Sequence, residues 1–243
     1  MSSTRPRRGL RLLAIAIVFL TCLGFIADRV AESLAEDRLA TVAENEAARY
    51  DVRAADTSVE VGGFGFLPQL ARGEFSRIRL TMQRPTISSI PAQDLTVAMT
   101  GVHVPRELLT GDKGAAVRVD SAELRLRFSP DTLTKLAART SDLHGLTFQI
   151  VGAKLQARVV VQGVEVGATV RSQPQNGRIR LVVDDLPAAV PSTVRDAVNS
   201  LLAKGIVVPD LPFSASLKEV AVDGQSVLLT ATAANVELPA AGP

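Results

Sequence analysis

The sequence predicts an α+β domain in which helices cover one face of a long, curved antiparallel β-sheet, preceded by an N-terminal membrane segment. Three observations lead to this prediction: an uncharged apolar run near the N-terminus, a series of alternating apolar and polar segments beyond residue 56, and two segments of helical spacing that interrupt the series. We divide the 243 residues into a basic tail and hydrophobic segment at 1–27, an amphipathic helix at 28–50 and an α+β domain at 51–239.

The charge of the chain is concentrated at its N-terminus. Arg5, Arg7, Arg8 and Arg11 lie in a stretch without acidic residues and supply +4 of a net charge of +2, so residues 12–243 carry −2. Binding to nucleic acid requires a surplus of Lys and Arg that neutralises phosphates. The composition of the body therefore argues against nucleic acid as a partner.

The hydrophobic run spans Leu12 to Ala27, 16 residues without a charge. As a helix it reaches ~24 Å, slightly less than a bilayer core of ~30 Å, and a snorkelling Arg11 extends it. Basic residues before the run and acidic residues after it indicate a signal peptide or an anchor with its N-terminus inside, and hence an exported body. Because no good A-x-A site follows the run, we favour an uncleaved anchor over a cleaved signal peptide.

Residues 28–49 are rich in Ala, Glu and Arg, and the apolar residues Val30, Leu34, Leu39 and Val42 recur at loosely helical spacing. This pattern predicts a helix that continues out of the membrane. It is typical of an amphipathic stalk or packing helix, and a partner-binding helix is the alternative.

Beyond residue 56 the apolar residues recur at every second position, as in strands with one apolar and one polar face. "VQGVEV" and "VDGQSV" have the composition of hairpin turns. The alternation is present at 78–82, 95–99, 124–128, 155–161, 164–170, 179–183, 213–217 and 227–233.

Two helices are predicted between these strands. Ser129 fits an N-cap with Pro130 at the first helical position, and the second helix runs from about Pro191 to Lys204, with Gly205 at the position after its end.

Catalytic and metal-binding patterns are weak. His103 and His144 are the only histidines, Cys22 is the only cysteine and lies in the hydrophobic run, and no G-x-S-x-G or H-E-x-x-H motif is present. The adjacent Asp184 and Asp185 leave a strand on opposite faces, so they cannot chelate one metal ion together. We therefore expect no enzyme activity, no metal and no cofactor.

The excess of apolar residues on long strands has two explanations, a closed core or a sheet rolled around a cavity for acyl chains. The stretch "VEVGGFGFLPQLARGEFSRIRL", Val59 to Leu80, raises the same choice locally. Phe64 and Phe66 lie among glycines there, where they either plug the end of the core or line the mouth of a channel.

The chain resembles the LmeA-like phospholipid-binding proteins of actinobacteria, a family long catalogued as a domain of unknown function. The resemblance rests on "ADRVAESLAEDRLA" after the hydrophobic run, on Val59 to Leu80, and on "LPFSASLKEVAVDGQSVLLTATAANVEL" near the end. It implies a tubular lipid-binding fold, with a long helix wrapped in a curved sheet that encloses an apolar channel. It also implies an extracytoplasmic cell-envelope protein that binds phospholipids such as phosphatidylinositol and supports maturation of the mannan-lipid lipomannan. We therefore expect a non-enzymatic protein that holds or transfers phospholipid.

With this resemblance we expect phospholipid and the plasma membrane as partners. An accessory protein for an envelope glycosyltransferase and a lipid-modifying enzyme are the alternative functions. Arg72, Arg77 and Arg79 are candidates for contacts with the lipid head group, although Arg77 and Arg79 also fit an ordinary solvated strand face. The candidate acyl-chain contacts are Phe64, Phe66, Leu67, Ile78, Leu80, Met82 and Phe213.

Overall fold

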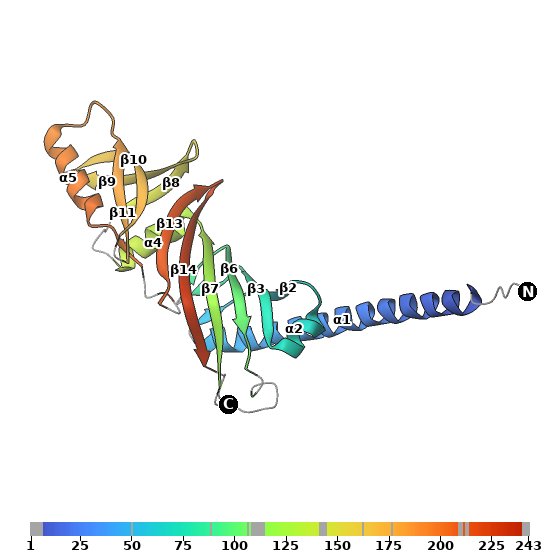
Figure 1. Cartoon of the computed structure of the whole chain (residues 1–243). Helices are drawn as coiled ribbons and strands as arrows, with labels where there is room; N and C mark the ends of the chain where they lie inside the picture. Colours follow the sequence, from blue (N-terminus) through green and yellow to red (C-terminus); the bar gives the residue numbers. More distant parts are fainter. Residues whose placement is uncertain are drawn as a thin grey trace, which may run out of the picture.

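The computed structural model describes residues 7–49, 51–87, 89–105, 107, 115–140, 145–161, 163–175, 177–208, 211 and 214–239. The described strands form two larger antiparallel sheets and one small sheet along an elongated body, from which a long N-terminal helix projects (Figure 1). The α+β class and the antiparallel strands are as predicted, but the strands lie in more than one sheet. Alternation specifies which face of a strand is buried and not which strand lies beside it.

The six-stranded sheet is curved and lies nearest the N-terminal helix (Figure 1). Its strand order is β13-β14-β7-β6-β3-β2, so the last strand of the chain, β14, lies between its sequence neighbour β13 and β7 from the middle of the chain. The strands are β2 (Asp56–Gly62), β3 (Glu74–Gln83), β6 (Asp94–His103), β7 (Ala116–Phe128), β13 (Ser216–Asp223) and β14 (Ser226–Pro239).

The five-stranded sheet has the order β12-β11-β10-β9-β8 and forms the far end of the body (Figure 1). Its strands are β8 (Thr147–Val151), β9 (Lys154–Val161), β10 (Val164–Gln175), β11 (Arg178–Asp185) and β12 (Ile206–Val207). The small sheet joins β1 (Val52–Arg53), β4 (Thr86–Ile87) and β5 (Ile90–Pro91). The predicted hairpin turns hold, since Val161 pairs with Val164 and Asp223 pairs with Ser226.

Both predicted helices within the body are present. α4 (Pro130–Thr140) begins where Ser129 Oγ accepts a hydrogen bond from the N–H of Thr132 at 3.2 Å, as expected of an N-cap. α5 (Ser192–Ala203) covers the five-stranded sheet, and Gly205 follows it with φ 67 and donates its N–H to Leu202 O. A left-handed residue at this place ends the helix.

The N-terminal helix α1 (Arg7–Arg49) is continuous, and it packs mainly on the edge strand β2 and on α2 (Phe66–Arg72). The helix packs on the body, but not through the apolar stripe that the sequence suggests. The stripe residues Val30, Leu34, Leu39 and Val42 are exposed. The small side chains of Ala31 and Ala35 face the core instead. Among residues with described side chains, which in α1 begin at Leu20, no helix has the length and hydropathy of a membrane span.

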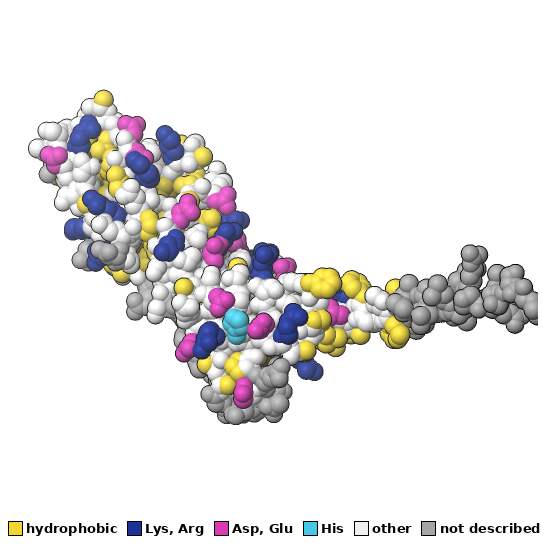
Figure 2. Space-filling view, in the orientation of Figure 1, with side chains coloured by type: hydrophobic (Ala, Val, Ile, Leu, Met, Phe, Trp, Pro, Cys, Tyr) yellow, Lys and Arg dark blue, Asp and Glu magenta, His cyan; other side chains and the backbone are white. Residues whose placement is uncertain are grey.

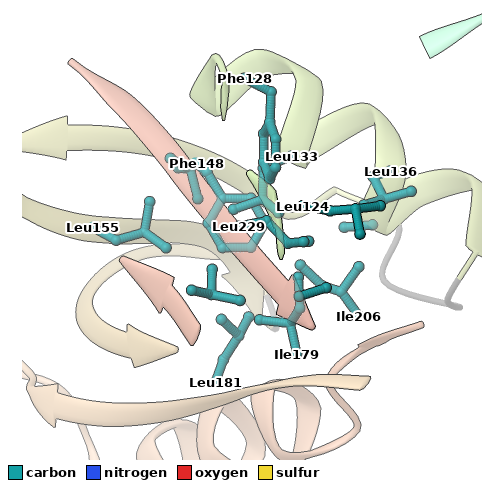
Figure 3. Close-up of a cluster of buried hydrophobic side chains, with 14 of the residues drawn as sticks. Leu124, Phe128, Leu133, Leu136, Phe148, Leu155, Ile179, Leu181, Ile206 and Leu229 are labelled. Atoms are coloured by element: carbon teal, nitrogen blue, oxygen red, sulfur yellow. The ribbon is translucent and has the colours of Figure 1, made fainter. Parts of the chain in front are cut away.

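One continuous core joins the two larger sheets. At the junction α4 lies between them, and side chains from α4 and from strands of both sheets meet, including Leu133, Phe128 and Phe148 (Figure 3). The five-stranded sheet and this junction are therefore closed by their own side chains, and the more open apolar surface lies on the six-stranded sheet.

Candidate functional site

The apolar residues of the six-stranded sheet gather on one face, which we call the inner face. The register places Ile78 beside Met99 and Leu80 beside Val97, and the rows continue across β7, β14 and β13. Val97 and Leu124 are buried in these rows. In contrast, Ile78, Leu80, Leu95, Met99 and Leu126 keep part of their surface exposed while packing against the core.

This partial exposure follows from the position of α1. The helix lies along β2, where the Glu36 carboxylate accepts the N–H of Val61 at 2.7 Å, a backbone donor at the sheet edge. Ala31 and Ala35 are the apolar residues that α1 turns towards the core, and their side chains cover little area. The inner face of β3, β6 and β7 is thus apolar and incompletely covered, as a site for acyl chains requires.

The strand alternation is interrupted near the end of the inner face that lies beside α2. The register skips Ser76, Gly101, Asp120 and Asn235 on four neighbouring strands, and Gly101 and Asn235 have positive φ. Beyond the interruption the parity of the buried residues changes, because the buried row is now Phe75, Val102, Val119 and Val236. The interruption directs the ring of Phe75 inward, towards α2.

The Gly/Phe turn separates its two phenylalanines. Phe66 begins α2 and is 6 % exposed, and its ring centroid lies 5.9 Å from that of Phe75. Phe64 is 95 % exposed and Leu67 is 40 % exposed. Both expectations treated the two rings alike, whereas Phe66 plugs the core and Phe64 points into solvent.

Two polar residues that the sequence analysis did not single out fix this turn. Asp28 of α1 accepts hydrogen bonds from the N–H groups of Phe66 at 2.9 Å and Leu67 at 2.7 Å. The N–H groups of Leu67 and Phe66 lower the pKa of the Asp28 carboxyl. The available signal is an acidic residue directly after the hydrophobic run, which by itself indicates only membrane topology.

Gln69 is the second such residue, and it is 3 % exposed. Its Oε1 accepts the N–H of Ser76 at 2.8 Å, at the interruption of β3, and its Nε2 donates to Gly65 O at 3.0 Å. Gly63, at φ 123, leaves room for this amide, because a Cβ there would lie 2.7 Å from Gln69 Oε1. In the sequence, the one local signal for the role of Gln69 is that a polar amide lies within an apolar stretch.

The candidate arginines are distributed over a polar surface. Arg77 and Arg79 lie on the outer face of β3, opposite in parity to Ile78, as the solvated-face interpretation predicts. Arg79 faces Glu60 at 3.5 Å, and both arginines line a hollow of about 270 Å³ with Glu32 and Glu36 of α1. Arg77 has no ion pair among the described residues, and it lies opposite Gly62, at the start of the turn. Arg72 ends α2 and is exposed.

A second hollow, of about 570 Å³, lies on the outer face of the same sheet. Its arginines form ion pairs with carboxylates. Arg127 Nη2 lies 2.9 Å from Asp223 Oδ2 and Arg127 Nη1 lies 3.7 Å from Asp94 Oδ2, while Arg125 Nε lies 2.6 Å from Glu123 Oε1. Neither this hollow nor the smaller one is an apolar cavity. The candidate site for acyl chains is therefore the inner face.

The remaining candidate residues have separate positions. Met82 is buried on the inner face beside Leu95, whereas Phe213 and His144 lie outside the described residues. His103 ends β6, where its Nε2 lies 3.4 Å from Asp120 Oδ1. Arg171 donates hydrogen bonds to the Asp184 carboxylate, and they lower the pKa of this carboxyl.

No group of three His, Cys, Asp or Glu residues suited to a metal ion occurs within the described residues. We found no match among curated proteins and none among solved structures. Residues 26–232 match the family model described as LmeA-like phospholipid-binding. The match begins two residues before Asp28 and includes the turn and every strand of the two larger sheets except the second half of β14, so the chain belongs to the LmeA-like phospholipid-binding family.

Proposed function

We propose that this chain holds phospholipid on the extracytoplasmic side of the plasma membrane, without chemical turnover, by placing acyl chains against the inner face. The observation that carries the proposal is the incomplete cover of Ile78, Leu80, Leu95, Met99 and Leu126 beside α1. Each methylene that an acyl chain buries there contributes roughly 0.8 kcal/mol before the costs of binding. The tubular lipid-binding fold that the resemblance implies would use a curved sheet in this way.

The attachment to the membrane is part of the proposal. The uncharged run Leu12 to Ala27 is helical and continues without a break into the part of α1 that packs on β2. An anchor of this kind holds the inner face close to its lipid source. Phosphatidylinositol or a related anionic lipid is the proposed ligand, with Arg77 and Arg72 as contacts for its phosphate. Through this lipid the chain supports lipomannan maturation.

The test uses the full chain in vesicles that contain a phospholipid with a photoreactive group at the end of one acyl chain. Cross-linked peptides are mapped by mass spectrometry, and peptides from β3, β6 and β7 are expected in addition to the N-terminal run. Cross-links confined to the N-terminal run would refute the lipid site. Turnover of radiolabelled phospholipid by the purified chain would refute the non-enzymatic role.

A matched pair of variants sharpens this test. Met99→Gln places an amide on the inner face, where a lipid leaves it without a hydrogen-bond partner, and Thr100→Gln makes the same change on the exposed outer face of β6. We expect Met99→Gln to reduce cross-linking to the body severalfold and Thr100→Gln to leave it unchanged. Circular dichroism confirms that both variants are folded. An equal effect of the two changes would contradict the assignment to the inner face.

A further inference from the structure

Exposed apolar side chains gather at the place where α1 leaves the body (Figure 2). Here the helix and the Gly/Phe turn present apolar groups together. Because these side chains are exposed in the described structure, they contribute little to its core, and a cluster of this kind indicates an interaction site. The cluster consists of Leu20, Leu23, Phe25, Ile26, Phe64 and Leu67.

The turn is held at one level of the helix. Asp28 accepts the N–H groups of Phe66 and Leu67 at 2.9 and 2.7 Å, so the turn cannot leave α1 without breaking both hydrogen bonds. Asp28 is also the first charged residue after the uncharged run Leu12 to Ala27. Phe64 therefore lies beside the end of the run, where a helix that enters a bilayer passes through the interface.

The local backbone keeps the Phe64 ring exposed. Gly63 and Gly65, which flank it, have φ of 123 and 71, a region that side chains other than glycine rarely adopt. Gln69 fills the space that a Cβ at Gly63 would require. The inward position of this turn is already occupied by Phe66, which packs on Phe75. An exposed ring in a fixed turn is suited to insertion into an apolar phase.

Two cations lie beside this cluster. Arg29 lies directly after Asp28, with its guanidinium 5.3 Å from the centroid of the Phe25 ring and its Nη1 2.6 Å from Glu32 Oε2, and Arg72 ends α2. Arginines beside an apolar surface suit the boundary between acyl chains and phosphate groups. The continuity of the cluster with the uncharged run and these flanking cations identify a lipid bilayer as its occupant.

We propose that Phe64 and Leu67 insert into the interface of the bilayer beside α1 and form a second membrane contact. This inference rests on the proposed membrane attachment and adds an orientation to it. With two contacts the body cannot rotate freely about the anchor. The Gly/Phe turn then stays against the membrane, while the five-stranded sheet lies away from it (Figure 1).

The experiment uses the absence of Trp from the sequence, which makes any introduced Trp a unique fluorescent reporter. Phe64→Trp places it in the turn, and Val160→Trp places it at an exposed apolar position of β9, in the five-stranded sheet, as the matched control. Both full-length variants are reconstituted into phosphatidylcholine and phosphatidylglycerol vesicles with or without brominated acyl chains. The flotation of each variant with the vesicles is measured in parallel.

We expect the emission of the Phe64→Trp variant to shift to shorter wavelength and to lose more than half its intensity in brominated vesicles, whereas the emission of the Val160→Trp variant stays unchanged. If the Phe64→Trp variant floats with the vesicles and its emission is not quenched, the inference that the turn contacts the bilayer is wrong, while attachment through the N-terminal run is supported. A chain that does not float refutes the anchor and the inference together. A blue shift without vesicles that grows with protein concentration would assign the cluster to a second copy and overturn the inference.

Discussion

Replacing Phe66 by Ala is expected to destabilise the chain far more than replacing Phe64, although only Gly65 separates them. Phe66 is 6 % exposed, with its ring centroid 5.9 Å from that of Phe75, and truncation of a buried Phe costs ~3–5 kcal/mol. For a chain of this length the loss lowers Tm by ~6–20 °C. Phe64 is 95 % exposed, so Phe64→Ala is expected to change the free energy of unfolding by no more than about 0.5 kcal/mol.

The assay is urea denaturation of the delipidated full chain, followed by circular dichroism, for Phe64→Ala, Phe66→Ala, Phe75→Ala and the double variant of Phe66 and Phe75. Because the two buried rings are in contact, their effects are expected to differ from additivity by ~0.5–1.5 kcal/mol. Destabilisation by Phe64→Ala of more than about 2 kcal/mol would refute the separation of the two rings, since surface changes rarely cost so much. A negligible effect of Phe66→Ala would refute it equally.

Three further changes test the polar contacts. Asp28→Asn should destabilise the chain at pH 7 and much less at pH 3. The folded state lowers the pKa of the Asp28 carboxyl, so the charged carboxylate stabilises the fold at pH values above the ordinary pKa of 3.8, and this stability is lost as the pH falls through the folded pKa. Equal urea midpoint differences at both pH values would contradict this role. Gln69→Leu removes the acceptor of the Ser76 N–H and should cost ~1–3 kcal/mol in urea denaturation, and a neutral result would show that the amide is dispensable. Arg77→Gln should weaken binding to anionic vesicles about fivefold at low salt, on the order of 1 kcal/mol, and Arg79→Gln should weaken it less, because Arg79 is paired with a carboxylate. Sedimentation with vesicles measures both affinities. Equal losses of affinity would argue against a head-group contact at Arg77.

The sequence was sufficient to predict features that depend on neighbouring residues. The N-cap at Ser129, the glycine after α5 and the buried parity of most strands are confirmed, because capping and alternation are local properties. The division into two larger sheets was not predictable in this way. It depends on which strands pair, and β14 pairs with β7, with the whole five-stranded sheet between them in the sequence.

The candidate site was predictable only in part. Ile78 and Leu80 lie on the inner face as their parity predicts, whereas the different positions of Phe64 and Phe66 depend on contacts distant in sequence. Asp28 is 38 residues from Phe66, and no local pattern connects them. The short helix that begins at Phe66 also replaces the alternation of a strand, so strand parity does not apply there.

The orientation of α1 favours an interior that the chain alone does not fill. A helix that closed the inner face would present its larger apolar residues to it, yet Val30, Leu34 and Val42 are exposed and Ala31 and Ala35 face the core. Each exposed Val or Leu forgoes roughly 1.5–3 kcal/mol of burial. The helix is held instead by carboxylates that accept backbone N–H groups of β2 and α2, which fix its position without filling the space beside it. Acyl chains against the inner face, as proposed above, would supply the missing apolar contact.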